Sequence, residues 1–337
     1  MSFKVHVEPS GHEFNVEAGE SILDAALKQG INLPYGCRNG FCGNCQSLLL
    51  SGKVDYPEGP PPALDENQPG ACLICKGVAM TDLTIEVKEI LAAQDIEIRE
   101  MPCKVERIER LNDDVIRLYL KLPEGERLQF LAGQYLNFIL ATGEKRAFSI
   151  ANPPHDDEFI ELHIRHVVGG AFTDFLFDGM KEKTIMRIEA PLGSYFLRED
   201  SDRPIIFMGG GTGFAPLKGI IEHAFEIGID RPMTLYWGVR SQKDLYLPDL
   251  PQQWAAQHPN FTYIPVLSEP DEGWQGRTGW VHDSVVQDHP DLSKFEIYMS
   301  GPPPMIDAGR AAFLAHALDQ ERLYSDSFEY GAAADKT

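Results

Sequence analysis

The stretch Cys37-Arg-Asn-Gly-Phe-Cys42-Gly-Asn-Cys45 decides how the first part of this chain folds and what it binds. Its three cysteines form a C-x4-C-x2-C run, and Cys75 follows later in the chain. Four thiolates at this spacing are typical of a site for a [2Fe–2S] cluster. The sequence therefore predicts that Cys37, Cys42, Cys45 and Cys75 are metal ligands.

A zinc site is the alternative, because Cys42–Cys45 and Cys72–Cys75 are two C-x-x-C pairs. Two such pairs can hold zinc in a tetrahedral all-thiolate site, which would use Cys72 and leave Cys37 idle. The glycines within Tyr35–Gly43 favour the iron–sulfur interpretation, since they let the backbone wrap closely and direct N–H groups at sulfur. Zinc requires no such loop.

Size and composition limit the class of protein. The 337 residues are enough for two or three domains. No apolar run approaches the roughly 20 residues that cross a membrane, and the first residues alternate like a strand without the apolar core of a signal peptide. We expect a soluble cytoplasmic protein without a membrane partner, in which the six cysteines serve metal binding or catalysis rather than disulfides.

The charge is strongly acidic. Asp and Glu number 51 against 30 Lys and Arg, which gives a formal net charge of −21. Nucleic-acid binding needs basic patches on the phosphate backbone, so the composition argues against it. An acidic surface suits a protein partner that presents positive charge.

Residues 1–92 carry the elements of a small α+β domain. A hairpin is predicted at Phe3–Val7 and Phe14–Val16, and a helix at Ser21–Gln29 with Ser21 as its N-cap. Two further strands are predicted at Gln46–Leu50 and Leu83–Val87. Together with the cysteine spacing, this pattern resembles the plant-type ferredoxin family, whose fold is a β-grasp. The resemblance implies a [2Fe–2S] ferredoxin domain over residues 1–92.

Residues 93–101 are predicted to be a linker, and residues 102–200 a second domain. Short strands separated by turn signals are expected at Cys103–Ile108, Val115–Leu120, Tyr135–Leu140 and Phe159–Val167. Such strands at this spacing predict an antiparallel β-barrel. His163 and His166 lie on the last of them and are interpreted as structural.

One short motif suggests what this barrel binds. Arg146-Ala-Phe-Ser149 resembles the R-x-[YF]-S motif of the ferredoxin–NADP reductase superfamily. The resemblance implies that the barrel binds FAD, that Arg146 pairs with its pyrophosphate and that Phe148 packs on the flavin. It also implies a catalytic role for Ser149, whose hydroxyl would bond near flavin N5.

Three further stretches resemble the same superfamily in the expected order. Gly133-Gln-Tyr135 resembles its G-Q-[YF] strand, which makes Tyr135 a cofactor-binding residue. Gly169–Thr173 resembles its G-x-x-[ST] turn, so Gly170 and Thr173 are expected at the FAD pyrophosphate. Ala190-Pro-Leu-Gly-Ser-Tyr-Phe resembles the turn that closes the flavin domain, with alanine in place of the usual first glycine.

Residues 201–330 alternate strands and helices, which predicts a doubly wound α/β domain with a parallel sheet. Pro204–Met208 reads as a buried strand that runs into the glycine loop Gly209–Pro216 and then a helix over Leu217–Glu226. A strand, a glycine loop and a helix form a phosphate cradle. The loop resembles the G-G-x-G-x-[AT]-P pyridine-nucleotide loop of the superfamily. The residues that this implies at the nucleotide are Gly210, Gly211, Thr212, Gly213 and Pro216.

Two C-terminal stretches are expected beside the nicotinamide. Ser300-Gly-Pro-Pro-Pro-Met305 resembles the superfamily's C-G-P-P-x-M loop, with serine in place of cysteine. The resemblance implies nucleotide contacts from Gly301, Pro302 and Met305 and a catalytic position for Ser300. Phe328 is expected to cover the flavin face where nicotinamide docks, as a third catalytic residue.

The choice of nucleotide depends on the stretch after Trp237. Arg240 could hold a 2′-phosphate, which would mean NADPH, whereas Asp244 would disfavour one. Both are expected to bind cofactor. The G-V-R…D-L-Y pattern resembles NADH-using oxygenase reductases, so NADH is predicted and NADPH stays open.

The three modules in this order resemble one-chain electron-transfer reductases, and residues 331–337 form a tail. The resemblance implies that electrons pass from NADH through FAD and the [2Fe–2S] cluster to a partner protein. The stretches Tyr35–Cys45, Leu131–Asn152, Gly209–Lys218 and Tyr324–Phe328 resemble the branch of CDP-6-deoxy-Δ3,4-glucoseen reductases, whose partner is a pyridoxamine-phosphate (PMP)-dependent dehydrase. Reductase components of aromatic or alkane oxygenases are the alternative. A non-enzyme alternative is a zinc-stapled nucleotide-binding regulator.

Overall fold

The computed structural model describes residues 2–65, 67–90, 92 and 96–328. The chain divides into two compact units, Met1–Glu97 and Ile98–Thr337, and each has hydrophobic cores of its own. Among the described residues, no helix combines the length and apolar character needed to span a membrane.

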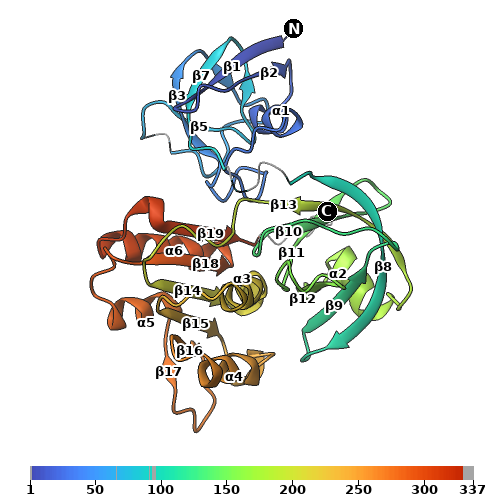
Figure 1. Ribbon diagram of the computed structural model, residues 1–337, viewed down its shortest axis with the longest axis vertical. Coiled ribbons are helices and arrows are strands. Elements are labelled where there is room, and N and C mark those ends of the chain that lie inside the picture. The colour runs from blue at the N-terminus through green and yellow to red at the C-terminus, as the bar shows by residue number, and fades with distance from the viewer. Residues whose placement is uncertain (1, 66, 91, 93–95, 329–337) are drawn as a thin grey trace. The chain divides into compact units, whose positions relative to one another are not determined.

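The first unit is the expected β-grasp (Figure 1). Its mixed sheet has the order β2-β1-β7-β3-β5, and helix α1 packs against β2. The elements are β1 Ser2–Glu8, β2 Glu13–Glu17, α1 Ile22–Lys28, β3 Gln46–Ser51, β5 Ala71–Leu73 and β7 Leu83–Glu86, with a small pair formed by β4 Val54–Asp55 and β6 Val78–Ala79. Ser21 caps α1 by accepting a hydrogen bond from the Asp24 amide, as predicted.

The second unit begins with an antiparallel sheet of order β11-β10-β13-β8-β9-β12. The elements are β8 Arg99–Arg110, β9 Val115–Lys121, β10 Tyr135–Ile139, β11 Lys145–Ser149, β12 Ile160–Arg165, α2 Ala171–Asp178 and β13 Ile185–Leu192. An isolated bridge between Ile150 and Leu162 links the two ends of this sheet. The sheet therefore closes on itself into the predicted barrel, which α2 covers with buried Phe172 and Leu176.

The linker predicted for residues 93–101 overlaps β8. Arg99–Met101 are paired with Ala190–Ile188 of β13, so these residues extend the barrel strand. The polar sequence shows no alternation there, and the strand exists because β13 supplies its hydrogen-bond partners. Residues 93–95, like the tail at 331–337, lie outside the described residues.

The rest of the second unit is a parallel sheet of order β17-β16-β15-β14-β18-β19. The strands are β14 Ile205–Gly210, β15 Met233–Val239, β16 Phe261–Leu267, β17 Arg277–Thr278, β18 Glu296–Gly301 and β19 Leu323–Ser327; the helices are α3 Phe214–Glu226, α4 Asp249–Gln257, α5 Val281–Asp288 and α6 Pro303–Ala315. Alternate residues of β14 enter two different cores, Phe207 with α3 and Met208 with α5 and α6. The sheet is thus buried on both faces, as in doubly wound folds.

The strand order creates the crevice in which such sheets bind ligands. The chain runs from β14 outward to β17 and then returns to place β18 on the other side of β14. The helices that follow β14 and β18, α3 and α6, therefore cover opposite faces of the sheet, which marks a topological switch point where open α/β sheets bind their ligands. Both predicted nucleotide loops lie at this point.

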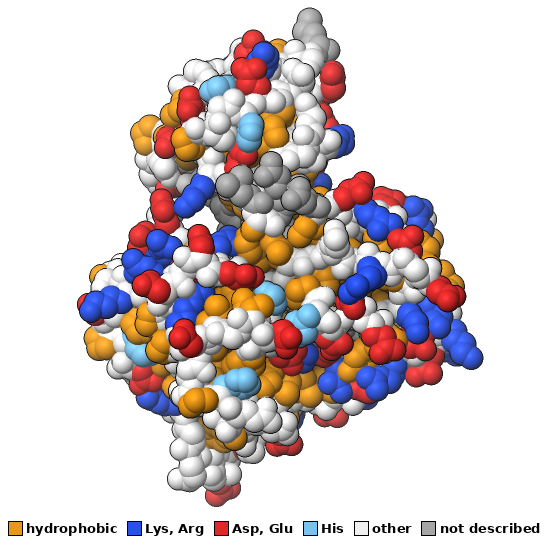
Figure 2. All heavy atoms as spheres, in the orientation of Figure 1, with side chains coloured by type: hydrophobic (Ala, Val, Ile, Leu, Met, Phe, Trp, Pro, Cys, Tyr) orange, Lys and Arg blue, Asp and Glu red, His pale blue; other side chains and the backbone are white. Residues whose placement is uncertain are grey.

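Charges are dispersed over the face of the molecule seen in Figure 2. Asp and Glu side chains lie among Lys and Arg side chains there and do not form one continuous acidic patch. The net charge of −21 belongs to the whole chain and favours positively charged partners in general. On this face it does not mark one docking site.

Candidate functional site

The four predicted cluster cysteines meet in two pairs. Cys37 and Cys42 form one pair, in which each backbone N–H lies 3.4 Å from the sulfur of the other. A hydrogen bond from the Cys42 thiol lowers the pKa of Cys37 to about 5, and one from Cys45 lowers the pKa of Cys75. The same hydrogen bonds raise the pKa of the donor thiols Cys42 and Cys45, so within each pair the first thiolate is stabilised by the second thiol. The thiolate is the form that binds metal.

This arrangement matches the ligand set of a binuclear cluster. A [2Fe–2S] cluster needs two thiolates on each of two irons, and the four cysteines meet as two pairs. The loop is also close-packed, because a Cβ on Gly36 would lie 3.1 Å from Cys42 Sγ.

Cys72 is not a member of either pair. It is buried on β5, paired in register with Ser47 of β3, and burial raises its pKa to about 12. The geometry therefore supports the ligand set that uses Cys37 and leaves Cys72 as part of the core.

The barrel brings the predicted flavin residues together along β11. The ring of Phe148 packs against Phe172 of α2 with 5.4 Å between centroids, which joins the Arg146–Ser149 strand to the helix that follows Gly170. Arg146 is half-buried, and its guanidinium lies 3.1 Å from Glu144 Oε2. The cationic fork and the N-terminus of α2 are both suited to a pyrophosphate.

Two of the residues predicted to bind flavin also have local structural roles. The Thr173 hydroxyl donates to the Val167 carbonyl at 2.9 Å and so closes the turn before α2. Tyr135 is paired with Ser149 in register, and a Cβ on Gly193 would lie 2.9 Å from its ring. Gly193 has φ +91, a conformation that favours glycine, so the turn after β13 can approach Tyr135 closely.

The nucleotide loops after β14 and β18 pack directly on each other. A Cβ on Gly213 would lie 1.9 Å from the Ser300 carbonyl oxygen, and one on Gly210 would lie 2.5 Å from Met305 Sδ. Only glycine permits this approach, which leaves the backbone of both loops close together. Helix α3 begins at Phe214 rather than at the predicted Leu217, so Pro216 lies in its first turn. Proline has no backbone N–H, and in the first turn of a helix this breaks no helical hydrogen bond.

The three residues predicted to be catalytic meet around Asp326. The Ser149 hydroxyl lies 3.0 Å from Asp326 Oδ2, and Asp326 is paired in register with Ser300. Phe328 donates its N–H to the Gly301 carbonyl at 2.9 Å. Sequence reasoning took Phe328 from the segment Tyr324–Phe328 and missed Asp326, because no motif within that segment gives the aspartate a partner.

Arg165 is a second residue that sequence reasoning missed. It ends β12, and a Cβ on Gly211 would lie 2.9 Å from its Nη1. Its Nε lies 3.1 Å from Asp114 Oδ2 as an ion pair, but Nε and Nη2 are buried without a hydrogen-bond partner among the described residues. Unpaired guanidinium donors beside a glycine loop are suited to a phosphate.

The structure gives Asp244 a local structural role. Its carboxylate is buried and accepts hydrogen bonds from the Ser241 amide at 2.9 Å and the Ser241 hydroxyl at 3.0 Å. Asp244 therefore caps the turn after β15. Arg240, on the same turn, is exposed.

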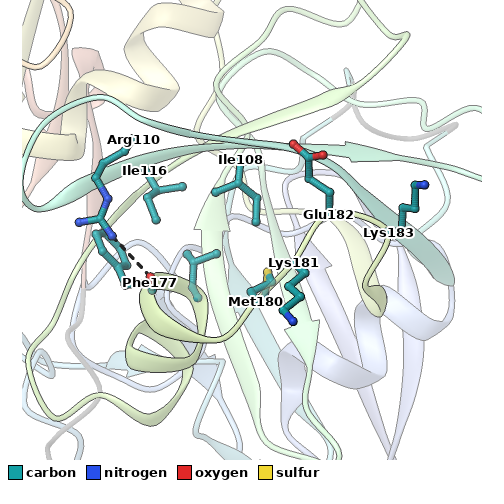
Figure 3. Close-up of a pocket in the computed structure, with 9 residues that line it drawn as sticks. Ile108, Arg110, Ile116, Phe177, Met180, Lys181, Glu182 and Lys183 are labelled. Atoms are coloured by element: carbon teal, nitrogen blue, oxygen red, sulfur yellow. Dashed lines mark hydrogen bonds between the residues drawn. The ribbon is translucent and has the colours of Figure 1, made fainter.

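A hollow of about 600 Å³ lies elsewhere on the barrel (Figure 3). It is lined by Ile108, Arg110, Ile116, Leu176, Phe177, Met180, Lys181, Glu182 and Lys183. Arg110 donates to the Phe177 carbonyl at 3.4 Å across its edge. None of the predicted cofactor-binding residues lines it.

Comparison with known proteins matches all three parts of the chain. Family models described as the 2Fe-2S iron-sulfur cluster binding domain, the oxidoreductase FAD-binding domain and the oxidoreductase NAD-binding domain match residues 5–79, 102–196 and 207–311. CDP-6-deoxy-L-threo-D-glycero-4-hexulose-3-dehydrase reductase of Yersinia pestis is 40% identical over 328 residues, which are 97% of this chain and 99% of that protein. This chain belongs to the one-chain iron–sulfur flavoprotein reductases.

Other relatives of this reductase serve oxygenases. Terephthalate 1,2-dioxygenase reductase component 1 of Comamonas sp. is 35% identical over 332 residues, which cover 97% of this chain and 98% of that protein. The crystal structure of an Amycolatopsis cytochrome P450 reductase superposes with a TM-score of 0.81 at 32% identity, covering 97% of this chain and 98% of that one. The reductase thus uses a [2Fe–2S] cluster, FAD and a nicotinamide nucleotide, and transfers electrons to a partner.

Proposed function

We propose that this reductase passes electrons from NADH to a PMP-dependent dehydrase of deoxysugar synthesis, as a CDP-6-deoxy-Δ3,4-glucoseen reductase does. The observation that carries the proposal is the similarity to the Yersinia dehydrase reductase over 97% of the chain, at 40% identity. The oxygenase reductases span the chain equally well, but at lower identity, such as the 35% of the terephthalate enzyme.

The geometry supports the following cofactor contacts. Cys37 and Cys42 would hold one iron, and Cys45 and Cys75 the other, because the thiols meet in these pairs. Arg146 and the backbone at Gly170–Thr173 would bind the FAD pyrophosphate. When bound, FAD takes hydride from NADH and supplies single electrons to the [2Fe–2S] cluster.

The nucleotide would bind at the switch point. The glycine loop Gly209–Gly213 and the Arg165 guanidinium would hold its phosphates, with Gly301, Pro302 and Met305 on the other side of the crevice. Ser149 would contact the flavin edge, and the Asp326 carboxylate 3.0 Å from its hydroxyl can orient that hydroxyl and hold a proton beside it. Ser300 and Phe328 would border the nicotinamide.

An anaerobic reductive titration tests the relay. The holoprotein should take up about three electrons per chain, two on FAD and one on the iron–sulfur cluster. Uptake of only two electrons, together with absence of iron, would leave a flavoprotein without a relay. Parallel assays with NADH and NADPH should show the higher kcat/KM for NADH.

The partner is tested by affinity capture. The NADH-reduced protein is used as bait in its native lysate under argon, and the co-eluting proteins are identified. Recovery of a PMP-dependent dehydrase, followed by NADH oxidation that depends on that dehydrase and its nucleotide-sugar substrate, is the expected result. Recovery of an oxygenase hydroxylase component that drives NADH oxidation would instead support the alternative function, the reductase component of an oxygenase.

A further inference from the structure

A buried group of charged and polar side chains joins the flavin barrel to the nucleotide domain. Its members are Glu161, His163, Lys218, Glu222 and Tyr246. Glu161 and His163 lie on β12 of the barrel, whereas Lys218 and Glu222 lie on α3 of the nucleotide domain. None of them belongs to the cofactor contacts proposed above.

Lys218 is the centre of this group. Its ammonium lies 3.2 Å from Glu161 Oε2, 2.9 Å from Glu222 Oε2 and 3.3 Å from the carbonyl of Ala151. All three of its hydrogen-bond donors are therefore directed at acceptors, two of which belong to the barrel. Burying such charges is costly, and a well-packed apolar pair would often be at least as stable, so stability alone does not account for them.

His163 fixes the other carboxylate oxygen of Glu161. Its fully buried ring lies 2.8 Å from Glu161 Oε1 through Nε2 and 3.0 Å from the Tyr246 hydroxyl through Nδ1. Burial opposes ionisation of Glu161, but the His163 hydrogen bond and the Lys218 charge lower its pKa to about 2. Arg117, 4.0 Å away, adds a second positive charge. The Glu161 carboxylate thus has a partner at each oxygen, Lys218 at Oε2 and His163 at Oε1.

The group connects the two segments proposed to hold the reacting cofactors. Ala151, whose carbonyl accepts from Lys218, lies two residues after Ser149, the last residue of β11. Lys218 itself lies on the helix that follows the glycine loop Gly209–Gly213. At the next residue, a Cβ on Gly219 would lie 3.0 Å from the Asn152 carbonyl oxygen, so α3 and this segment touch.

We propose that Lys218 is a positioning residue for hydride transfer, held by Glu161 and Glu222 so that one ammonium sets the separation between the Ser149 segment and the nucleotide loop. The proposal rests on the roles proposed above for Ser149 and Gly209–Gly213. Nicotinamide and flavin must approach closely and in alignment for hydride transfer, and a misplacement of about 1 Å can lower a rate roughly a hundredfold.

The test is anaerobic stopped-flow reduction of the flavin in the full-length holoprotein, with NADH concentration varied. Lys218→Met keeps the length of the side chain and removes its charge. The limiting rate of flavin reduction should fall about tenfold or more, while the NADH Kd from the same data stays within about twofold. The long-wavelength absorbance that reports nicotinamide stacked on flavin should also weaken, and Lys218→Arg should restore part of the rate.

Arg231→Met is the matched control. The Arg231–Glu296 pair is equally buried, with 3.0 Å between Nη1 and Oε2. Arg231 also donates at 2.6 Å to the carbonyl of Arg198, which lies after β13 and not on β11 or β12. Its loss should lower the melting temperature and leave the limiting rate of flavin reduction unchanged. If Lys218→Met does not retain FAD, Glu161→Gln, which keeps the shape of the carboxylate, is measured in its place with the same expectation.

Two outcomes would overturn the proposal. One is a limiting rate within twofold of the unaltered protein in the Lys218 and Glu161 variants. The other is a loss of rate that Arg231→Met reproduces in full, since this would show a general effect of breaking a buried ion pair. Ser149→Ala tests the underlying site separately: if it leaves flavin reduction unchanged, the role of Ser149 is wrong whatever the Lys218 variants show.

Discussion

At the scale of single residues, Cys37 and Cys72 compete for the same role. Sequence spacing allows either to complete a four-thiolate site with Cys42, Cys45 and Cys75, one for [2Fe–2S] and the other for zinc. In the structure Cys37 contacts Cys42, and Cys72 is buried in a strand pair with Ser47. Proximity thus distinguishes two thiols that spacing alone does not.

Replacing Cys37 or Cys72 by serine should have opposite effects on the iron–sulfur cluster. Cys37→Ser should lose the iron–sulfur cluster, because one iron then lacks a thiolate. Cys72→Ser should retain it, with a modest loss of stability from a buried hydroxyl. Iron and acid-labile sulfide per chain measure both variants. Full iron content in Cys37→Ser would contradict the ligand assignment.

Arg165 is expected to bind the nucleotide through its unpaired donors. Arg165→Met should raise the NADH Kd about tenfold to a hundredfold, the range for losing a hydrogen bond to a charged group. The limiting rate of flavin reduction should change little, since phosphate contacts hold the nucleotide equally before and during the reaction. Titration of the holoprotein with NAD⁺ or NADH measures the effect.

Arg187→Met is the control for Arg165. Arg187 lies on β13, is exposed and pairs with Glu100 at 2.8 Å, so its loss should leave nucleotide affinity unchanged. An unaltered Kd in Arg165→Met would show that this guanidinium serves only its ion pair with Asp114.

At the scale of elements, the contact between the loops after β14 and β18 shapes the proposed nucleotide site. Gly213→Ala would place a methyl group 1.9 Å from the Ser300 carbonyl, so one loop must move. Overpacking of this kind costs about 1–3 kcal/mol. We expect NADH binding to be lost, as measured by flavin reduction at high NADH. Gly179→Ala is the control, because its nearest atom is 3.2 Å away on the Phe175 side chain.

The contact between β12 and α3 predicts a pH dependence. The pKa of Glu161 is about 2 in the folded protein, against 4.5 for an ordinary glutamate, so its ionisation stabilises the fold above pH 4.5. This contribution is lost as pH falls from about 4.5 towards 2. Glu161→Gln should therefore show a shallower decline of unfolding free energy over that range. Burial raises the pKa of Glu222, so its contribution to stability changes with pH in the opposite sense. This contribution is common to both proteins, because Glu222 is present in each.

Tryptophan fluorescence is a suitable measurement for that prediction. The four tryptophans, Trp237, Trp254, Trp274 and Trp280, all lie in residues 201–330. Their emission reports unfolding of the part that contains α3, independently of the first unit. Identical pH slopes in Glu161→Gln and the unaltered protein would contradict the pKa of Glu161.

At the scale of the whole molecule, the division at Glu97 and Ile98 predicts separable activities. Among the described residues, the cores of the second unit are built from side chains of Met101 onward, so a chain of residues 98–337 should fold alone. It should bind FAD and reduce ferricyanide with NADH at a rate near that of the full chain. It should fail to reduce the protein partner, because the iron–sulfur cluster is absent. Partner reduction by the truncated chain would show that the flavin is the direct donor.

The amino-acid sequence by itself determined the local structure and the chemistry of the site. Strand alternation and helix caps are local properties, and they predicted β1, α1 and β9 nearly to the residue. The spacing of Cys37–Cys45 and the glycines of Gly209–Gly213 likewise lie within single segments. For these features the physical cause is a few neighbouring residues.

The tertiary structure decided which distant segments meet. Arg99–Met101 became a strand because β13 lies beside them, and Asp326 reached Ser149 because β19 adds to the sheet next to β18. Arg165 lies against Gly211 for the same reason, although these residues are far apart in sequence. A side chain's partners depend on packing between elements, and no periodicity or motif within one segment encodes them.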